Sequence, residues 1–448
     1  MRLAVLWGER LERWTLQLSG KRLAVAWLVL SIIYSVAPVR MQTDTIWVIP
    51  TAISLATDGD AELSEYGEAT AQNPHGLTRS PTGGIYSTFP IGNAALATPL
   101  VWLTGKVAHV LAALPTPLDR PFTRWLRESA PSPGVSLGFF DTTEVLISSA
   151  IVAAGIVAFF LLCRAFSSSK TAFLLSLALA LGTPALSTWT RGLWSHAPAF
   201  SGLAIAAAAL ATGRALRRTS ALIGLAIAFA VISRPTAALP ALVLLSIHVL
   251  LKARKRQVSS IAITLAGVLL VLGPWVFSSW RTWGTVLPPY YSPQRLESSL
   301  TDSLGAMAGQ LFSPSRGLFV FVPILLLCVG LPFVRKRIAV AHLIALALGL
   351  AHVVLVSRFP HWWGGHSYGP RLSSDAVPFL LFATLPVVDS FLEGRGRRVV
   401  LAAMIGWGLF TNVVGATRKS TWRWNGTPVD VDANPDRLWD WSDPQFLR

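Results

Sequence analysis

Apolar runs of about bilayer length recur along the chain, separated by short connections that carry most of its basic residues. Only a helix or a closed barrel satisfies its own backbone hydrogen bonds in lipid. The pattern predicts an all-α polytopic membrane protein with about eleven transmembrane helices. These lie approximately at residues 23–39, 142–163, 171–188, 197–212, 221–233, 236–251, 259–277, 318–334, 338–356, 375–392 and 399–415.

One further apolar run, residues 91–114, is long enough to cross the membrane, but polar residues such as Asn93 and Lys106 interrupt it. Whether this run crosses decides the topology. If this run crossed the membrane, every later connection would change sides. The basic clusters share the cytoplasmic side only if it does not cross. These clusters are residues 214–218, 252–256, 335–337 and 395–398. We therefore expect an amphipathic juxtamembrane helix on the outer face, within one large first external (periplasmic) loop at residues 40–140.

Composition agrees with a membrane protein, since 52% of the 448 residues are hydrophobic and the mean hydropathy is +0.53. The net charge of +16 lies in short clusters between apolar runs, so no nucleic acid is expected as a partner. We expect a bacterial inner membrane, with residues 1–22 cytoplasmic and residues 418–448 a short Trp-rich periplasmic tail. A cleaved signal peptide ending near Ala37 is the alternative for the N-terminus.

The external connections are long and mix polar with aromatic residues, whereas the cytoplasmic ones are short and basic. This asymmetry places any chemistry outside. Four arginines at outer helix ends oppose the positive-inside bias and are candidates for binding a lipid phosphate, because a guanidinium matches phosphate bidentately. They are Arg191, Arg234, Arg316 and Arg371. The alternative is that each reaches the lipid headgroups.

His196 lies close to Arg191 and is either a structural histidine or a phosphate ligand. The external segment WWGGHSYGPR, residues 362–371, is too polar for an aromatic belt alone. Its glycines permit a close backbone approach, and its side chains add hydrogen-bond donors. Trp363, His366 and Tyr368 are therefore candidate substrate contacts.

Asp44 is the first acidic residue after the first apolar run. Ionisation is costly so near the membrane unless the group has a partner or a task. It is either paired with Arg40 or a general base for an acceptor hydroxyl. The following acidic run, Asp58 to Glu65, is either a site for Mg²⁺ or Ca²⁺ or a solvated turn in which Asp60 caps a helix. The turn is favoured, so no cofactor is certain, and Glu65 is a candidate substrate contact.

Several short segments resemble the GT-C superfamily of polyprenyl-phosphate-sugar-dependent glycosyltransferases. Within it, the chain is most similar to bacterial relatives of the dolichyl-phosphate-mannose protein mannosyltransferases and of the lipid A aminoarabinose transferase. The matching segments are Asp44 with residues 52–55 and 58–60, then residues 84–90, 312–317 and 362–371. The chain departs from its better-known relatives in lacking a large C-terminal soluble domain.

The resemblance implies an inverting transfer from a polyprenyl-phosphate sugar, such as an undecaprenyl- or decaprenyl-phosphate sugar, to an acceptor hydroxyl. Asp44 would be the base, and Arg191, His196, Arg316 and Arg371 would bind the donor phosphate. The acceptor, whether glycan, lipid or protein, is left open. The alternatives are an O-antigen-ligase-like or polymerase-like transferase, whose essential groups would lie in a late external loop, and a transporter or flippase for a lipid-linked sugar.

Overall fold

The computed structural model describes residues 20–112, 138–212, 217–292 and 296–448. The described chain is almost wholly helical, and its one sheet is a two-stranded antiparallel hairpin of β1 and β2. The main elements are α2 (Gly20–Val36), α3 (Val48–Thr57), α4 (Glu68–Gln72), β1 (Leu77–Arg79), β2 (Ile85–Ser87), α5 (Gly92–Ala112), α7 (Gly138–Arg164), α8 (Ser169–Leu181), α9 (His196–Ala211), α10 (Arg217–Ser233), α11 (Ala238–Arg254) and α12 (Val258–Trp283). The second half contains α13 (Leu300–Phe312), α14 (Leu318–Phe321), α15 (Val340–Ser357), α16 (Val377–Ala383), α17 (Leu385–Glu393), α18 (Arg395–Thr417) and α19 (Lys419–Arg423).

Five helices of the described chain are long and apolar enough to cross a membrane, and a sixth span is counted if a bent pair forms one. They lie at Asp141–Arg164, Pro235–Arg254, Val258–Trp283, Val340–Ser357 and Arg395–Thr417, and the bent pair comprises Leu372–Ala383 and Leu385–Glu393. On α12, Leu269 and Leu270 are about two-thirds exposed, as expected of side chains that face lipid rather than water. The chain is therefore a helical membrane protein, while eleven spans is more than these helices supply.

Prolines explain part of this shortfall. The expected span at residues 318–334 is not one helix: α14 ends at Phe321 and a 3₁₀ helix, Pro323–Arg337, follows with a second proline at Pro332. The expected span at 375–392 bends by 52° before Pro386. Proline lacks the backbone donor that a continuous helix requires, so apolar composition alone overestimated the length of these helices.

Glycines bring the central helices into close contact. A Cβ added to Gly202 on α9 would lie 2.4 Å from the carbonyl oxygen of Ala226 on α10. A Cβ on Gly224 of α10 would lie 2.2 Å from the carbonyl oxygen of Thr264 on α12. Backbone contacts of this kind are typical of helices packed in a membrane. They hold α9, α10 and α12 together beside the region where the external loops meet.

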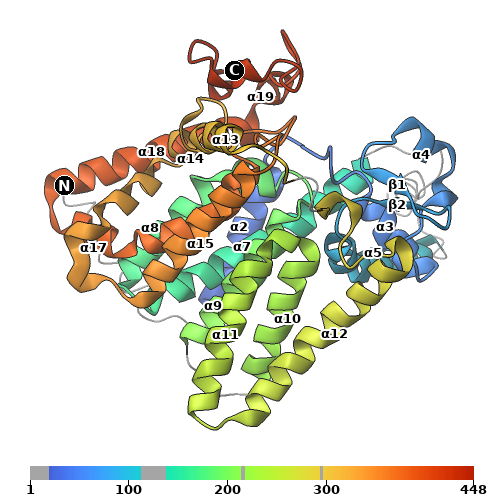
Figure 1. Cartoon of the computed structure of the whole chain (residues 1–448), viewed down its shortest axis with the longest axis horizontal. Coiled ribbons are helices and arrows are strands. Elements are labelled where there is room, and N and C mark those ends of the chain that lie inside the picture. The colour runs from blue at the N-terminus through green and yellow to red at the C-terminus, as the bar shows by residue number, and fades with distance from the viewer. Residues whose placement is uncertain (1–19, 113–137, 213–216, 293–295) are drawn as a thin grey trace.

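Residues 91–114, expected to form a juxtamembrane helix, contain the helix α5, which is described to Ala112. It packs against α3, and their shared apolar cluster includes Ile49, Ala52, Ala94 and Ala97. Figure 1 shows α3, α5 and the hairpin together at one side of the molecule. The C-terminal segment lies at the end opposite the basic turn between α11 and α12 (Figure 1).

Candidate functional site

Asp44 lies in the turn between α2 and α3, and it does not pair with Arg40 as one interpretation of the sequence held. Its carboxylate forms an ion pair with the guanidinium of Arg371 and accepts a 3.0 Å hydrogen bond from Nε2 of His75. The Asp44 side chain is 15% exposed and that of Arg371 9% exposed. The structure thus joins the segment after α2 to residues 362–371, which are more than 300 positions later in the chain.

The position of Arg371 is fixed on three sides. Besides Asp44, its guanidinium donates to the Gly364 carbonyl oxygen at 3.0 Å and lies 4.0 Å from the ring centre of Trp194. Gly364 has a φ of +78°, a conformation that residues with a Cβ seldom adopt. The glycine expected to allow a close backbone approach therefore shapes the turn that holds Arg371.

The surroundings of Asp44 keep it ionised. Burial opposes its charge, but the positive charge of Arg371 and hydrogen bonds from His75 and Arg371 outweigh this effect and lower the pKa of Asp44 to about 2. Conversely, the hydrogen bond to Asp44 raises the pKa of His75 above its usual value. The resting site is therefore a carboxylate held between the Arg371 guanidinium and the His75 imidazole, whose charged form it favours.

Asp44 and Arg371 line a cavity of about 270 Å³, whose other walls include residues near the C-terminal ends of α10 and α12. The same cavity is lined by Ser195, Arg234 and Tyr290. It brings two carboxylates, those of Asp44 and Asp60, and two guanidinium groups to a common space. Such an arrangement can bind a phosphate and hold a base beside it.

Arg234 is positioned by a second acidic residue, Asp375. The Arg234 Nε donates to the Asp375 carboxylate, and its Nη1 donates to Ser195 Oγ at 3.0 Å. The other Asp375 oxygen lies 2.6 Å from Nδ1 of His196, which is fully buried. The His196 side chain does not line the described part of the cavity. It is connected to the cavity indirectly, because it contacts Asp375 and Asp375 contacts Arg234.

Arg234 and Asp375 also line a larger, apolar cavity of about 680 Å³ between α9, α11, α15 and α16. Most of its other lining residues are aliphatic or aromatic, including Leu203, Leu244 and Phe379. Arg234 thus lies where an apolar cavity and a polar cavity approach each other. An amphiphile with an anionic head fits this boundary in charge and polarity.

Arg191 and Arg316, predicted as phosphate ligands, do not line either described cavity. Arg191 is fully buried and donates to the carbonyl oxygens of Tyr34 and Ala37. Arg316 is also buried and donates to the Trp363 carbonyl oxygen at 3.1 Å. Both guanidinium groups are engaged by the protein itself, because helix ends and loops leave carbonyl groups that need donors.

The predicted substrate contacts from residues 362–371 also lie away from the described cavities. Tyr368 is fully buried and donates to the Thr411 carbonyl oxygen at 2.5 Å. Trp363 donates to Asp432 at 2.7 Å, and His366 lies 2.9 Å from Asp430. These partners lie on α18 and in the C-terminal segment. The three side chains therefore hold the loop at residues 362–371 in place.

Glu65 is exposed on the short 3₁₀ helix Ser64–Tyr66 and does not line either described cavity. In the acidic run, Asp60 accepts a 3.0 Å hydrogen bond from the backbone N–H of Glu62. It does not cap a helix, because Leu63 occupies the N-cap position of Ser64–Tyr66 and makes no side-chain capping bond. The run forms a turn, and the described residues show no cluster there with the spacing of metal ligands.

The C-terminal segment 418–448 packs against the loop at residues 362–371 and against Arg316. Trp424, Val431 and Leu438 pack with Trp363 in one small apolar cluster. Gln445 is fully buried and accepts hydrogen bonds from Arg316 and from the backbone N–H of Gly369. The segment therefore fixes both ends of the loop that presents Arg371.

Sequence reasoning missed His75, Ser195 and Asp375 as parts of this constellation. Asp375 begins an apolar run, which is the signal that singled out Asp44, so it was open to the same argument. His75 offered no such signal, because it lies in a polar loop and is brought to Asp44 only by the fold of residues 58–90.

Comparison with solved structures finds similarity to archaeal oligosaccharyltransferases. One is the Archaeoglobus fulgidus oligosaccharyltransferase in complex with Zn and sulfate, at 14% identity and a TM-score of 0.44, covering 94% of this chain and 57% of that one. Another is AglB from Archaeoglobus fulgidus in complex with an inhibitory peptide and a dolichol-phosphate, at 11% identity and a TM-score of 0.45, covering 96% and 60%. The chain thus spans about three-fifths of their length. No family model and no curated protein matches it.

Proposed function

We propose that the chain is a GT-C-type membrane glycosyltransferase that moves a sugar from a polyprenyl phosphate to an acceptor hydroxyl. The observation that carries this proposal is one cavity lined by the ionised Asp44 and by Arg234 and Arg371. A glycosyl transfer from a lipid phosphate requires both a base and cationic groups for the leaving phosphate. The motifs around Asp44 and at residues 362–371 point to the same class.

Arg234 is the proposed anchor of the donor phosphate, together with Arg371. The apolar cavity that reaches Arg234 would take the first isoprenoid units of the carrier, and the polar cavity would take the sugar. Of the predicted set Arg191, His196, Arg316 and Arg371, this proposal keeps Arg371 in contact with the phosphate and adds Arg234. His196 acts as a positioning residue, since it holds Asp375 and Asp375 holds Arg234.

In the proposed reaction, the acceptor oxygen forms a bond to the anomeric carbon while the bond from that carbon to the phosphate oxygen breaks. Inversion follows from attack opposite the leaving group. Asp44 receives the acceptor proton, and the lipid phosphate leaves with the bonding electron pair. Arg234 and Arg371 stabilise the charge that develops on this phosphate.

The pairing of Asp44 with Arg371 suggests how a weak base is strengthened. With a pKa of about 2, the resting carboxylate attracts a proton poorly. A donor phosphate that draws the Arg371 guanidinium away removes the nearest positive charge, which raises the proton affinity of Asp44. The base is thus activated when the donor is bound.

The proposed setting is a bacterial inner membrane with the N-terminus in the cytoplasm and the C-terminus and site outside. Positive-inside placement of the basic clusters supports this orientation, and it requires that α5 does not cross. The acceptor is any hydroxyl compound that reaches the cavity from the external side.

The test measures release of undecaprenyl phosphate from undecaprenyl-phosphate hexoses and pentoses, using the full chain in membranes of its own host. Asp44→Asn keeps the side-chain shape but removes the base, so transfer should fall by about 10²-fold or more while undecaprenyl phosphate still binds. Glu65→Gln is the matched control and should transfer normally, because Glu65 is exposed outside the cavity.

Full transfer by Asp44→Asn would refute the assignment of the base. Loss of transfer in Arg371→Lys together with full activity of Asp44→Asn would favour the ligase-like alternative. Movement of an intact lipid-linked sugar across vesicles, without its cleavage, would favour the flippase.

A further inference from the structure

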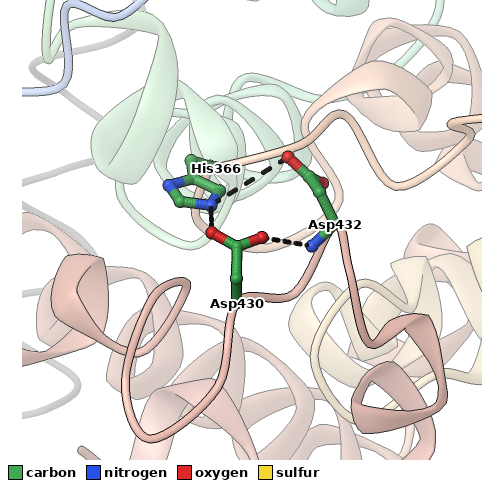
Figure 2. Close-up of side chains that lie close together, drawn as sticks. All are labelled: His366, Asp430 and Asp432. Atoms are coloured by element: carbon green, nitrogen blue, oxygen red, sulfur yellow. Dashed lines mark hydrogen bonds and ion pairs between the residues drawn. The ribbon is translucent and has the colours of Figure 1, made fainter.

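A histidine and two aspartates from distant segments meet at the surface of the C-terminal segment. His366 belongs to the loop that ends at Arg371, and Asp430 and Asp432 belong to the segment docked on it. Their ligating atoms all lie within 4.8 Å of one another, and Figure 2 shows the three side chains converging. We propose that these residues bind a divalent transition-metal ion, Zn²⁺ or Mn²⁺, that links the two segments.

The distances suit an ion of this size. Nε2 of His366 lies 2.9 Å from Oδ2 of Asp430 and 4.0 Å from Oδ2 of Asp432. Ligand atoms about 2.0–2.1 Å from a tetrahedral Zn²⁺ are about 3.3 Å apart. No separation among the three atoms exceeds 4.8 Å, so changes of up to about 1.5 Å would place them around one ion. The ion would then replace the proton that His366 and Asp430 share.

Each carboxylate is oriented by a contact to its other oxygen. Oδ1 of Asp430 accepts the backbone N–H of Asp432 at 2.9 Å, which leaves Oδ2 for His366. Oδ1 of Asp432 accepts the indole N–H of Trp363 at 2.7 Å, which leaves its Oδ2 on the same side. Outer contacts of this kind fix ligand orientation in metal sites. Trp363, buried at 8% exposure, connects the site to the packed base of the loop.

The ligand chemistry selects the class of ion. One imidazole and two carboxylates suit Zn²⁺ and Mn²⁺, whereas Mg²⁺ and Ca²⁺ prefer sites made of oxygen alone. The side chains are between 34% and 47% exposed, so water can complete the coordination. An ion here offsets the repulsion between two carboxylates that the fold holds together.

The expected effect is on the attachment of the C-terminal segment. A bound ion would add a link between residues 430–432 and the loop that presents Arg371, in addition to the contacts of Gln445. None of the three ligands lines the described cavity that contains Asp44. The proposal is therefore independent of the proposed glycosyl transfer.

The experiment titrates ZnCl₂ and MnCl₂ into the EDTA-treated, dialysed full chain in detergent, and measures heat of binding and thermal midpoint. We expect one site per chain and a rise in midpoint, because an ion that binds only the folded state stabilises it. His366→Gln and Asp430→Asn should weaken binding by at least 10-fold and remove the rise. Trypsin should also cleave after the exposed Arg423 more slowly with Zn²⁺ in the wild type alone.

Two matched variants guard against adventitious binding. His361→Gln changes an exposed histidine of the same loop, and Asp436→Asn an exposed aspartate of the same segment, so both should bind like the wild type. Three results would each overturn the proposal. These are wild-type affinity in folded His366→Gln, equal losses of affinity in the two control variants, and no binding at millimolar ZnCl₂. Folding of every variant is checked by size-exclusion chromatography, and two ligand variants are used in case one is unstable.

Discussion

Replacing Arg371 by methionine should destabilise the protein because it leaves Asp44 ionised without its main counter-charge. Methionine keeps most of the length and apolar contact of the arginine side chain, so the change isolates its charge. Both members of the ion pair are largely buried, at 9% and 15% side-chain exposure. Removing one partner of a buried pair costs about 3–5 kcal/mol.

Two local contacts modify this estimate. His75 remains 3.0 Å from the Asp44 carboxylate and retains part of the compensation, which lowers the cost. Loss of the 4.0 Å contact between the guanidinium and the Trp194 ring adds about 1 kcal/mol. We expect a net loss of about 3 kcal/mol in the free energy of unfolding, which for a chain of 448 residues corresponds to about 3 °C in thermal midpoint.

The double variant Asp44→Asn/Arg371→Met separates charge from packing. With Asp44 neutral, no orphan carboxylate remains, so the double variant should lose only about 1 kcal/mol. Intrinsic tryptophan fluorescence of detergent-solubilised protein, heated at one fixed rate, provides the midpoints. If the losses of the two single variants simply add in the double variant, the two side chains are not coupled and the ion-pair argument is refuted.

Two further predictions concern packing and pH. Gly224→Ala on α10 should lower the thermal midpoint by several degrees, because the added Cβ would lie 2.2 Å from the Thr264 backbone. The control is Gly273→Ala, whose added Cβ would have nothing within 4 Å, so this variant should be neutral or stabilising. His75 has a raised pKa, so its stabilising charge is fully present below pH of about 6.5 and lost as the pH rises through the raised value. The effect of this charge on the free energy of unfolding should stay below about 1 kcal/mol, because the His75 side chain is 59% exposed. His75→Gln should flatten this part of the pH profile of the thermal midpoint. An unchanged profile would contradict the pairing with Asp44.

The helical membrane class followed from the sequence because bilayer-length apolar runs have few other uses. The break between the predicted runs 221–233 and 236–251 was also predicted, and α10 ends at Ser233 with Arg234 in an extended conformation. The expected number of eleven spans is not confirmed, because two of the apolar runs form broken helices at Pro323 and Pro386. Apolar composition reports affinity for lipid, whereas helix continuity depends on single residues.

The candidate site was predicted in part. Asp44 and Arg371 were selected from the sequence, and the structure places them in contact. Arg191 and Arg316 carried the same signal but became internal donors to carbonyl groups. A charge beside an apolar run shows that a partner is needed, yet whether that partner is a ligand or the protein's own backbone is decided by contacts between distant segments.

The contacts of Gln445 bear on the order in which the protein is made. Its side-chain amide bonds to the Ser367 carbonyl oxygen, to the Gly369 N–H and to Arg316. During synthesis the loop at 362–371 leaves the ribosome more than 70 residues before Gln445. The helices can enter the membrane as they emerge, but the loop acquires these three bonds only after Gln445 has crossed to the same side. In the proposed orientation, assembly of the site is therefore coupled to export of the chain's last segment.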